Sequence, residues 1–356
     1  MIILHIGNIT LDKCSGVNVI VPQHIIYQQN LCDVAFLNIN NQKVYGIKKQ
    51  FAYDSSFSID KLPAPFNFPD LVVFHEIYRP QYLKIYKELL KKNIKYIIFP
   101  HGGLTKTAQS KKKLKKLIAN QLFFYNFFKH ASAIQCLSKK ECMQTSNQYL
   151  KFIGTNGVKL QSYKEKRKSM TKVNFSFIGR FEIYIKGLDL LIEALTILKD
   201  KNELKEKFLI TLYGPDENGS HKKMNELISK NNLEEYIKVS KPIFDEAKKN
   251  ILDQTDIYIQ VSRTEGMSGS ILEALANGVP CLITEGTGMK EYIEKYDAGW
   301  ASMTSAIDIA NKIAESIYDQ ERSIKGMNAQ KLIAENFDWD IITKQNIEQY
   351  QKILEM

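Results

Sequence analysis

The sequence has few cysteines and no long apolar run, and each shortage excludes a class of protein. Its five cysteines are scattered, and no two of them form a C-x-x-C pair, so we expect buried thiols rather than a disulfide framework or a zinc site. No apolar run approaches the roughly 20 residues that cross a bilayer. Residues 1–6 lack the basic flank and cleavage signature of a signal peptide and suit a buried strand instead. These features predict a cytoplasmic protein. The cysteines are Cys14, Cys32, Cys136, Cys142 and Cys281.

Acidic residues are scarce in the first half of the chain. Residues 1–160 carry 22 Lys and Arg against 8 Asp and Glu, whereas the remainder carries 27 against 31. Such asymmetry suggests that the first half meets an anionic partner, which can be a membrane surface, a nucleic acid or a phosphorylated substrate. The composition is otherwise globular, with 44% hydrophobic and 25% charged residues, and 356 residues suffice for two domains.

Short apolar runs without alternation recur along the chain, and segments with helical periodicity separate them. Such runs are typical of strands buried on both faces, and hence of parallel sheets covered by helices. Helices are expected over residues 187–199 and 222–230. The sequence therefore predicts an α/β fold. The expected strands are 2–6, 34–37, 71–74, 96–99 and 133–136 in the first half, and 175–178, 209–213, 257–261 and 281–283 in the second.

Two segments mark expected boundaries along the chain. Residues 161–172 are charged, carry no apolar period and lie between two strand signals, so we expect a linker there between domains 1–160 and 173–340. Asp338-Trp339-Asp340 opens a helical stretch that continues over 341–356. The D-x-D pattern resembles a metal motif, but Asp at a helix start satisfies free amides and complements the helix dipole. A helix cap is therefore expected there, and no metal.

The richest segment for chemistry is residues 265–280. A strand runs into a loop of small residues, which runs into a helix that begins near Ser268. In an open α/β sheet such a junction lies where ligands bind, and amides of a first helical turn can hold a diphosphate. Glu273, one to two turns into the helix, can accept hydrogen bonds from a ribose diol, and Glu265 on the loop can face a hexose. The competing interpretation is an ordinary strand–loop–helix with surface glutamates.

A pair of cations follows the strand at 175–178. Arg180 and Lys186 lie six residues apart, just before a helix. Arg offers a bidentate fork and Lys a mobile point charge, and together they suit the neutralisation of a leaving diphosphate. The alternative is that both are solvated loop cations.

The order of these motifs resembles a known family. G-R-x(5)-K-G-x-D-x-L-I-x-A, Tyr213-Gly214-Pro215 and then E-x(7)-E within L-E-A-x-A-x-G-x-P are similar to the family 4 retaining glycosyltransferases (glycosyl transferases group 1) of the GT-B fold. The resemblance covers roughly residues 153–340. It implies two Rossmann-like domains that face each other across a cleft, an acceptor-binding first domain, a second domain that holds a nucleotide sugar, and a final helix that crosses back to the first.

The resemblance also implies roles for individual residues. Arg180 and Lys186 match the diphosphate-binding pair, Glu273 the ribose-binding carboxylate, and Glu265 the carboxylate beside the transferred sugar. Because the two cations neutralise the leaving group, no cofactor or metal is expected. The nucleotide sugar is a co-substrate, and the resemblance implies that its nucleotide is UDP. The further donor-binding residues implied are Met267, Ser268, Gly269 and Ser270 by their amides, and Ile243 near the base.

In the first half the resemblance is looser. The family carries a Gly-Gly loop after its first strand, whereas this chain has Ser15-Gly16, so Gly16 is expected to keep the close approach to donor and acceptor and Ser15 to alter the acceptor fit. His101, in Phe99-Pro100-His101-Gly102-Gly103, stands where similar enzymes contact the donor sugar near the reaction centre. Asn156 matches a turn that faces the cleft. A structural histidine and a plain turn are the alternatives.

A basic segment lies within residues 106–129. Leu114, Leu117, Ile118 and Leu122 recur at helical spacing beside five lysines, and a dense aromatic run follows. This pattern resembles an amphipathic element that rests on an anionic membrane surface, which would place the protein at the inner face of the membrane. A core helix with one solvated lysine edge is the competing interpretation.

The favoured function is transfer of a hexose from a nucleoside diphosphate sugar to an acceptor hydroxyl with retention of configuration, in bacterial cell-surface polysaccharide or glycolipid synthesis. The acceptor would be a glycan or a lipid-linked glycan. A nucleotide-sugar epimerase of the same fold is the alternative enzyme. Nucleic-acid binding through the basic first half is the alternative from another class, but it leaves the motifs of the second half unused.

Overall fold

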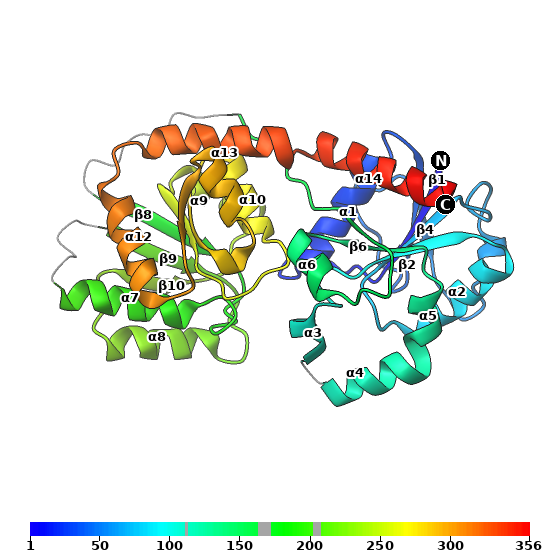
Figure 1. Cartoon of the computed structure of the whole chain (residues 1–356), viewed down its shortest axis with the longest axis horizontal. Coiled ribbons are helices and arrows are strands. Elements are labelled where there is room, and N and C mark those ends of the chain that lie inside the picture. Colours follow the sequence, from blue (N-terminus) through cyan, green and yellow to red (C-terminus); the bar gives the residue numbers. More distant parts are fainter. Residues whose placement is uncertain (111–112, 163–171, 202–207) are drawn as a thin grey trace. The chain divides into compact units, whose positions relative to one another are not determined.

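The computed structural model describes residues 1–110, 113–162, 172–201 and 208–356 (Figure 1). The chain divides into two compact units, each of which is described by itself. Unit 1 comprises Met1–Gly157 together with Trp339–Met356, and unit 2 comprises Val158–Asp338. Most of the expected linker, residues 163–171, lies outside the described residues.

Unit 1 is built on a seven-stranded parallel sheet with strand order β3-β2-β1-β4-β5-β6-β7. The order reverses between β1 and β4, which makes that pair the topological switch point of a doubly wound sheet. The strands are β1 (Ile2–Gly7), β2 (Asp33–Asn38), β3 (Gln50–Ala52), β4 (Leu71–His75), β5 (Lys95–Phe99), β6 (Ala133–Cys136) and β7 (Lys151–Ile153). The helices are α1 (Gly16–Gln28), η1 (Ile59–Lys61), α2 (Pro80–Lys91), α3 (Lys106–Ser110), α4 (Lys113–Ala119), the π-helical turn η2 (Asn120–Phe124), α5 (Tyr125–Lys129), α6 (Lys139–Gln144) and α14 (Trp339–Glu355).

Unit 2 repeats this plan with a six-stranded parallel sheet in the order β10-β9-β8-β11-β12-β13. Its switch point lies between β8 and β11. The strands are β8 (Val173–Ile178), β9 (Phe208–Tyr213), β10 (Ile237–Ser240), β11 (Ile257–Gln260), β12 (Cys281–Thr284) and β13 (Gly299–Ser302). The helices are α7 (Leu188–Asp200), α8 (Ser220–Lys230), α9 (Asp245–Asp253), α10 (Gly269–Ala276), η3 (Glu285–Thr287), α11 (Lys290–Tyr296), α12 (Ala306–Tyr318) and α13 (Arg322–Asn336).

The apolar runs of the sequence form the centres of both sheets, as predicted. Each is buried on both faces because helices cover both sides, and the core of unit 1 gathers around Phe74, Tyr96 and Phe127. Burial of such side chains contributes about 1.5–3 kcal/mol each. The prediction of a parallel α/β fold is confirmed.

Four short strands escaped the prediction from sequence: β3, β7, β10 and β13. Each has three or four residues and lies at the edge of its sheet. An edge strand is covered less completely than a central one, so polar residues such as Gln50 and Lys151 interrupt the apolar run that would mark it.

The helix after Asp338 belongs to unit 1. α14 begins at Trp339 and packs against α1 (Figure 1). The Trp339 ring stacks on Tyr27 with 5.1 Å between ring centroids, and Tyr350 is buried. Residues far apart in the sequence therefore complete one core. None of the helices traced over the described ranges is long and apolar enough to span a membrane.

Candidate active site

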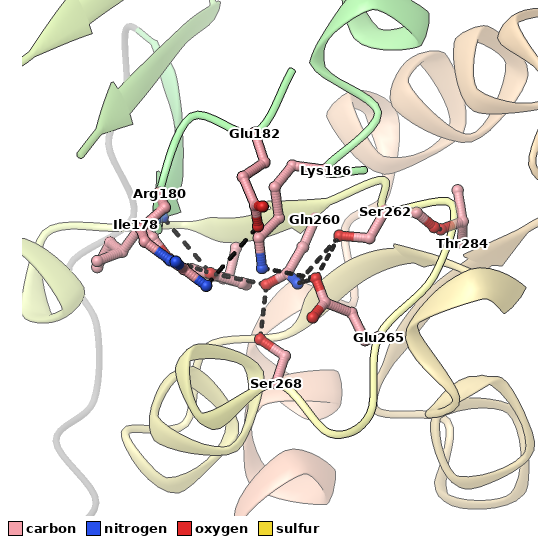
Figure 2. A network of polar contacts seen from close by, with 10 residues as sticks. Ile178, Arg180, Glu182, Lys186, Gln260, Ser262, Glu265, Ser268 and Thr284 are labelled. Atoms are coloured by element: carbon pink, nitrogen blue, oxygen red, sulfur yellow. Dashed lines mark hydrogen bonds and ion pairs between the residues drawn. The ribbon is translucent and has the colours of Figure 1, made fainter. Parts of the chain in front are cut away.

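An ion pair joins the two loops that the motifs of unit 2 singled out. The Lys186 Nζ lies 2.6 Å from Glu265 Oε1, and only 15% and 13% of the two side chains is exposed (Figure 2). Lys186 comes from the loop after β8, and Glu265 from the loop after β11. Because β8 and β11 are neighbours at the switch point, their carboxyl ends bring the two loops together.

Hydrogen bonds from β11 fix the Glu265 carboxylate. Its Oε1 also accepts from the Gln260 Nε2 at 2.9 Å and from the Ser262 hydroxyl at 2.8 Å. Three donors therefore converge on one oxygen, as the dashed lines in Figure 2 show. Among the described residues, the second oxygen of Glu265 receives no such bond, which leaves it available to a ligand.

The same network reaches the start of α10. The Ser268 hydroxyl donates to Gln260 Oε1 at 2.8 Å (Figure 2) and does not cap its own helix. The Tyr258 hydroxyl donates to Ile178 O, and burial raises the pKa of this hydroxyl. Because the Ser268 hydroxyl is engaged with Gln260, the first-turn amides of α10 lack the side-chain acceptor that a capping serine supplies. An anion is the ordinary partner of such amides.

Glycine allows the two loops of unit 2 to approach this closely. Gly187 has φ +65°, and a Cβ placed on it would lie 2.0 Å from the carbonyl oxygen of Val261. The Arg263 amide donates to Ile185 O at 2.8 Å and joins the same loops. The position of Lys186 opposite Glu265 thus depends on a residue without a side chain at 187.

Arg180 stands apart from the Lys186–Glu265 pair. Its guanidinium lies 3.7 Å from the Glu182 carboxylate, and about half of its side chain is exposed (Figure 2). A loosely paired, half-exposed Arg at the carboxyl end of β8 can turn toward a ligand, and its planar fork suits a phosphate.

Glu273 forms an ion pair with Lys248, which joins α10 to α9. About a third of the Glu273 side chain is exposed. Met267 and Ile243 are partly buried and pack on the apolar cluster that contains Ile271 and Leu275. A side chain on Gly269 would meet no atom within 4 Å, and Ser270 follows Gly269 in the first turn of α10.

The predicted residues of unit 1 lie at the carboxyl ends of its strands and at the start of α1. Ser15 precedes α1 without capping it, and a Cβ on Gly16 would meet nothing within 4 Å. His101 follows β5, has φ +49° and stacks on Phe99 at 3.9 Å between ring centroids. Asn156 is buried, and its Oδ1 lies 3.0 Å from the His24 Nε2. The side-chain oxygen of Asn156 is thus engaged within unit 1.

Sequence reasoning missed several residues that shape these sites. Gln260 and Ser262 hold Glu265, Lys248 pairs with Glu273, and Arg263 makes a bidentate ion pair with Asp189 at 2.6 and 2.8 Å. A signal existed for Gln260, because a polar residue inside an apolar strand run requires a buried partner. No local pattern marks Lys248, whose partner lies 25 positions away.

The segment 106–129 divides between core and surface. Phe124, Phe127 and Phe128 are buried in unit 1, which agrees with the core-helix interpretation for the aromatic run. Five apolar side chains of α4 and η2 are instead exposed. We call these side chains, together with Lys113 and Lys115, the lysine-flanked patch; its apolar members are Leu114, Leu117, Ile118, Leu122 and Phe123. Lys111 and Lys112 lie outside the described residues.

Solved structures share the fold of the whole chain. The Anabaena protein HepE, crystallised with UDP and glucose, superposes with a TM-score of 0.72 at 16% identity and covers 99% of this chain and 100% of its own. At that identity the likeness establishes the fold alone. The chain has the GT-B fold, the architecture of a class of glycosyltransferases, as its motif order predicted.

The second unit is similar to a known family. Residues 159–332, just under half of the chain, match the family model described as glycosyl transferases group 1. An uncharacterised glycosyltransferase of Methanocaldococcus jannaschii is 30% identical over 195 residues, which is 54% of this chain and 47% of that protein. An α-1,3-N-acetylgalactosaminyltransferase of Campylobacter jejuni, named for an undecaprenol diphosphate-linked acceptor, is 27% identical over 173 residues, 48% of this chain and 43% of that protein. The matched segments thus span less than half of these curated relatives.

Proposed function

We propose that this protein transfers a hexose from a nucleoside diphosphate sugar, with UDP the favoured nucleotide, to an acceptor hydroxyl with retention of configuration. The observation that carries the proposal is the Lys186–Glu265 pair, held among buried polar groups at the switch point of unit 2. A cation and a carboxylate fixed side by side suit a ligand that has a diphosphate at one end and sugar hydroxyls at the other.

Each site residue has a role in this proposal. Lys186, Arg180 and the first-turn amides of α10 bind the diphosphate and stabilise its growing charge. Glu265 accepts hydrogen bonds from the transferred sugar through its second oxygen. Glu273 exchanges part of its contact with Lys248 for the ribose hydroxyls.

Bond changes follow from the retained configuration. The bond from the anomeric carbon to the diphosphate oxygen breaks, and the diphosphate leaves with the electron pair. The acceptor oxygen then bonds to the anomeric carbon on the same face, and its proton passes to the departing phosphate oxygen. No side-chain base is required, and we propose that the two cations also make a metal ion unnecessary.

The setting we propose is assembly of a bacterial surface polysaccharide or glycolipid. The Campylobacter relative is named for an acceptor linked to undecaprenol diphosphate, and the Anabaena structure holds UDP and glucose. A glycan or lipid-linked glycan acceptor and a UDP-hexose donor are therefore the first candidates to test.

A transfer assay tests this function. Incubation with a panel of UDP-hexoses and lipid-linked acceptors in EDTA should give a glycoside whose anomeric proton coupling matches that of the donor. Inverted configuration, or dependence on an added divalent metal, would contradict the mechanism. Conversion of the donor to an isomer without any acceptor would identify an epimerase. In the same panel, a donor present at 100 times its Kd should stabilise the fold by about 2.7 kcal/mol in a thermal-shift measurement.

We further propose that the lysine-flanked patch contacts an anionic membrane. Leu114 on α4 and Leu122 on η2 are each 72% exposed, and Lys113 and Lys115 lie on α4 beside Leu114. Exposed apolar side chains beside lysines match the hydrocarbon edge and the charged headgroups of an anionic bilayer. Such contact would bring a lipid-linked acceptor to the protein.

Flotation with vesicles tests the patch. Wild-type protein should float with phosphatidylglycerol vesicles and not with pure phosphatidylcholine, and Leu122→Glu should weaken flotation about tenfold, since one inserted apolar side chain is lost and a negative charge is added. Leu31→Glu is the matched control, because Leu31 is an exposed leucine of unit 1 outside the patch. Equal binding of the two variants would exclude the patch as the contact.

A further inference from the structure

Arg263 stands between the two loops of unit 2 that carry Lys186 and Glu265. It belongs to the loop after β11, two positions before Glu265. Its Nη1 and Nη2 donate to the two carboxylate oxygens of Asp189 at 2.6 and 2.8 Å, and Asp189 lies in the first turn of α7, three positions after Lys186. A guanidinium fork that meets a carboxylate through two parallel hydrogen bonds is fixed in direction as well as in distance. Arg263 therefore ties the start of α7 to the loop after β11.

Arg263 also holds the residues that precede Lys186. Its Nη1 donates to Tyr184 O at 2.7 Å, and its backbone amide donates to Ile185 O at 2.8 Å. The guanidinium lies over the Tyr184 ring, 4.1 Å from the centroid, which adds a cation–π attraction. We call Arg263 and its three partners, Tyr184, Ile185 and Asp189, the Arg263 clamp. The clamp thus contacts the chain on both sides of Lys186.

The loop that carries Arg263 has anchors of its own. The Thr284 hydroxyl donates to Ser262 O at 2.6 Å, and the Glu265 amide donates to Gly286 O at 2.9 Å. These bonds join the residues before and after Arg263 to the end of β12 and to η3. Arg263 is therefore attached to a segment that is already fixed, and from there it can hold a neighbouring loop in place.

The backbone hydrogen bonds inside the Lys186 loop are local. The Lys186 amide, for example, donates to Glu182 O at 2.8 Å, which shapes a turn without joining it to another element. Arg263 supplies bonds that cross to this turn from the loop after β11. A lysine ammonium ends a flexible four-carbon stem. The ion pair with Glu265 therefore orients the ammonium, whereas the clamp fixes the backbone from which the stem extends.

Arg263 itself has little capacity left for a ligand. Both protons of its Nη1 and one of its Nη2 are committed to the clamp, and the Asp189 carboxylate neutralises its charge. Hydrogen bonding to Asp189 raises the pKa of Arg263, so the guanidinium stays charged. Arg180 differs, since its guanidinium lies 3.7 Å from Glu182 and about half of its side chain is exposed. The two arginines therefore have different roles, because only Arg180 is open to a ligand.

We propose that Arg263 and Asp189 are positioning residues for sugar transfer, which act on the leaving diphosphate only through Lys186. The clamp holds the backbone of residues 184–189 so that the Lys186 ammonium meets the negative charge where it develops. A displacement of about 1 Å at a catalytic group can lower a rate about 10²-fold, although the displaced group is still present. The part that concerns the diphosphate rests on the proposed function, whereas the attachment of the loop does not.

Hydrogen exchange of the ligand-free full chain tests the attachment. In Arg263→Met, the amides of residues 182–188 should exchange about tenfold faster than in the wild type, since the hydrogen bonds of a charged group are lost and the loop opens more often. The matched control is Arg322→Met, because Arg322 is also an arginine of unit 2 that donates to two backbone carbonyls, Ser316 O and Ile317 O. The control should leave exchange at 182–188 unchanged. Unchanged exchange in Arg263→Met would overturn the clamp.

Turnover in a double variant tests the positioning role. Arg263→Met should lower kcat about ten- to hundredfold. In the Lys186→Met background the same change should lower kcat by less than about threefold, because the ammonium that the clamp positions is absent. A role in folding alone would lower turnover by the same factor in both backgrounds, and that outcome would overturn the proposal.

Asp189→Asn gives a second measurement where Arg263→Met does not fold, because the amide keeps the shape of the carboxylate and removes its charge. Faster exchange at 182–188 and a loss of turnover that does not add to that of Lys186→Met are expected again, and their absence would overturn the proposal. Absence of transfer by the wild-type protein would instead count against the proposed function. The exchange measurement would still decide whether the clamp holds the loop.

Discussion

Lys186→Met is expected to lower the turnover of sugar transfer by about 10²–10³-fold, the usual effect of removing one donor that meets developing charge. The Lys186 ammonium lies 2.6 Å from Glu265 and is largely screened from solvent. Its charge therefore acts at close range, in a site where water screens it poorly. Methionine keeps much of the chain length of lysine, so the measured loss reports the charge.

Arg180→Ala should have an effect of the same order, because the mechanism assigns both cations to the leaving diphosphate. The matched control is Lys222→Met, since the Lys222 side chain is 83% exposed and its ion pair with Glu226 spans 3.9 Å. An exposed pair of this kind contributes about 0–1 kcal/mol. Steady-state kinetics with the identified donor and acceptor measure all three variants. Near-normal turnover in Arg180→Ala or Lys186→Met would contradict the proposal that these cations stabilise the leaving diphosphate.

A double variant of Lys186 and Glu265 tests whether the two side chains act on the substrate together. Residues in direct contact are expected to couple, so the effects of Lys186→Met and Glu265→Gln should not add in the double variant. Additive effects would mean that the two side chains act on the substrate independently.

Gly187→Ala is expected to lower the free energy of unfolding by about 2–5 kcal/mol, from the sum of backbone strain and overpacking. Position 187 has φ +65°, and the new methyl group would lie 2.0 Å from the carbonyl oxygen of Val261. A backbone oxygen cannot turn aside as a side chain can. The loop must therefore move, and Lys186 moves with it, so turnover should fall as well.

Gly219→Ala separates the two contributions to this loss. Gly219 also precedes a helix, with φ +70°, but a Cβ there would meet nothing within 4 Å. The free energy of unfolding of Gly219→Ala should therefore fall only by the cost of the left-handed backbone, about 1–2 kcal/mol. Urea titration of both variants gives the comparison. Equal losses would show that the approach of the two loops is not tight.

The sequence predicted what depends on neighbours along the chain. The strand 257–261, the helix near Ser268 and its end at Asn277 follow from apolar runs and from a glycine in the left-handed region at Gly278. The match of residues 159–332 to the glycosyl transferases group 1 likewise agrees with the order and spacing of the motifs. Edge strands such as β13 could not be predicted in this way, because an edge strand is only partly covered by neighbouring elements and so lacks a uniform apolar run.

Contacts between distant positions could not be predicted from one sequence. His5 and His75 are 70 residues apart, and only the pairing of β1 with β4 makes them neighbours. Their location inside apolar strands was the available signal, since a buried polar side chain requires a partner. The identity of that partner depends on the strand order, which a single sequence does not contain.

The composition of unit 1 from Met1–Gly157 and Trp339–Met356 has a consequence for biosynthesis. A ribosome makes every residue of unit 2 before it makes Trp339 and Tyr350, whose rings complete the core of unit 1. Domains generally fold as units during synthesis, with the earlier segment first. For this chain we expect the order of folding to be reversed. The core of unit 1 stays incomplete until Trp339–Met356 are made, and by then all of unit 2 is available to fold.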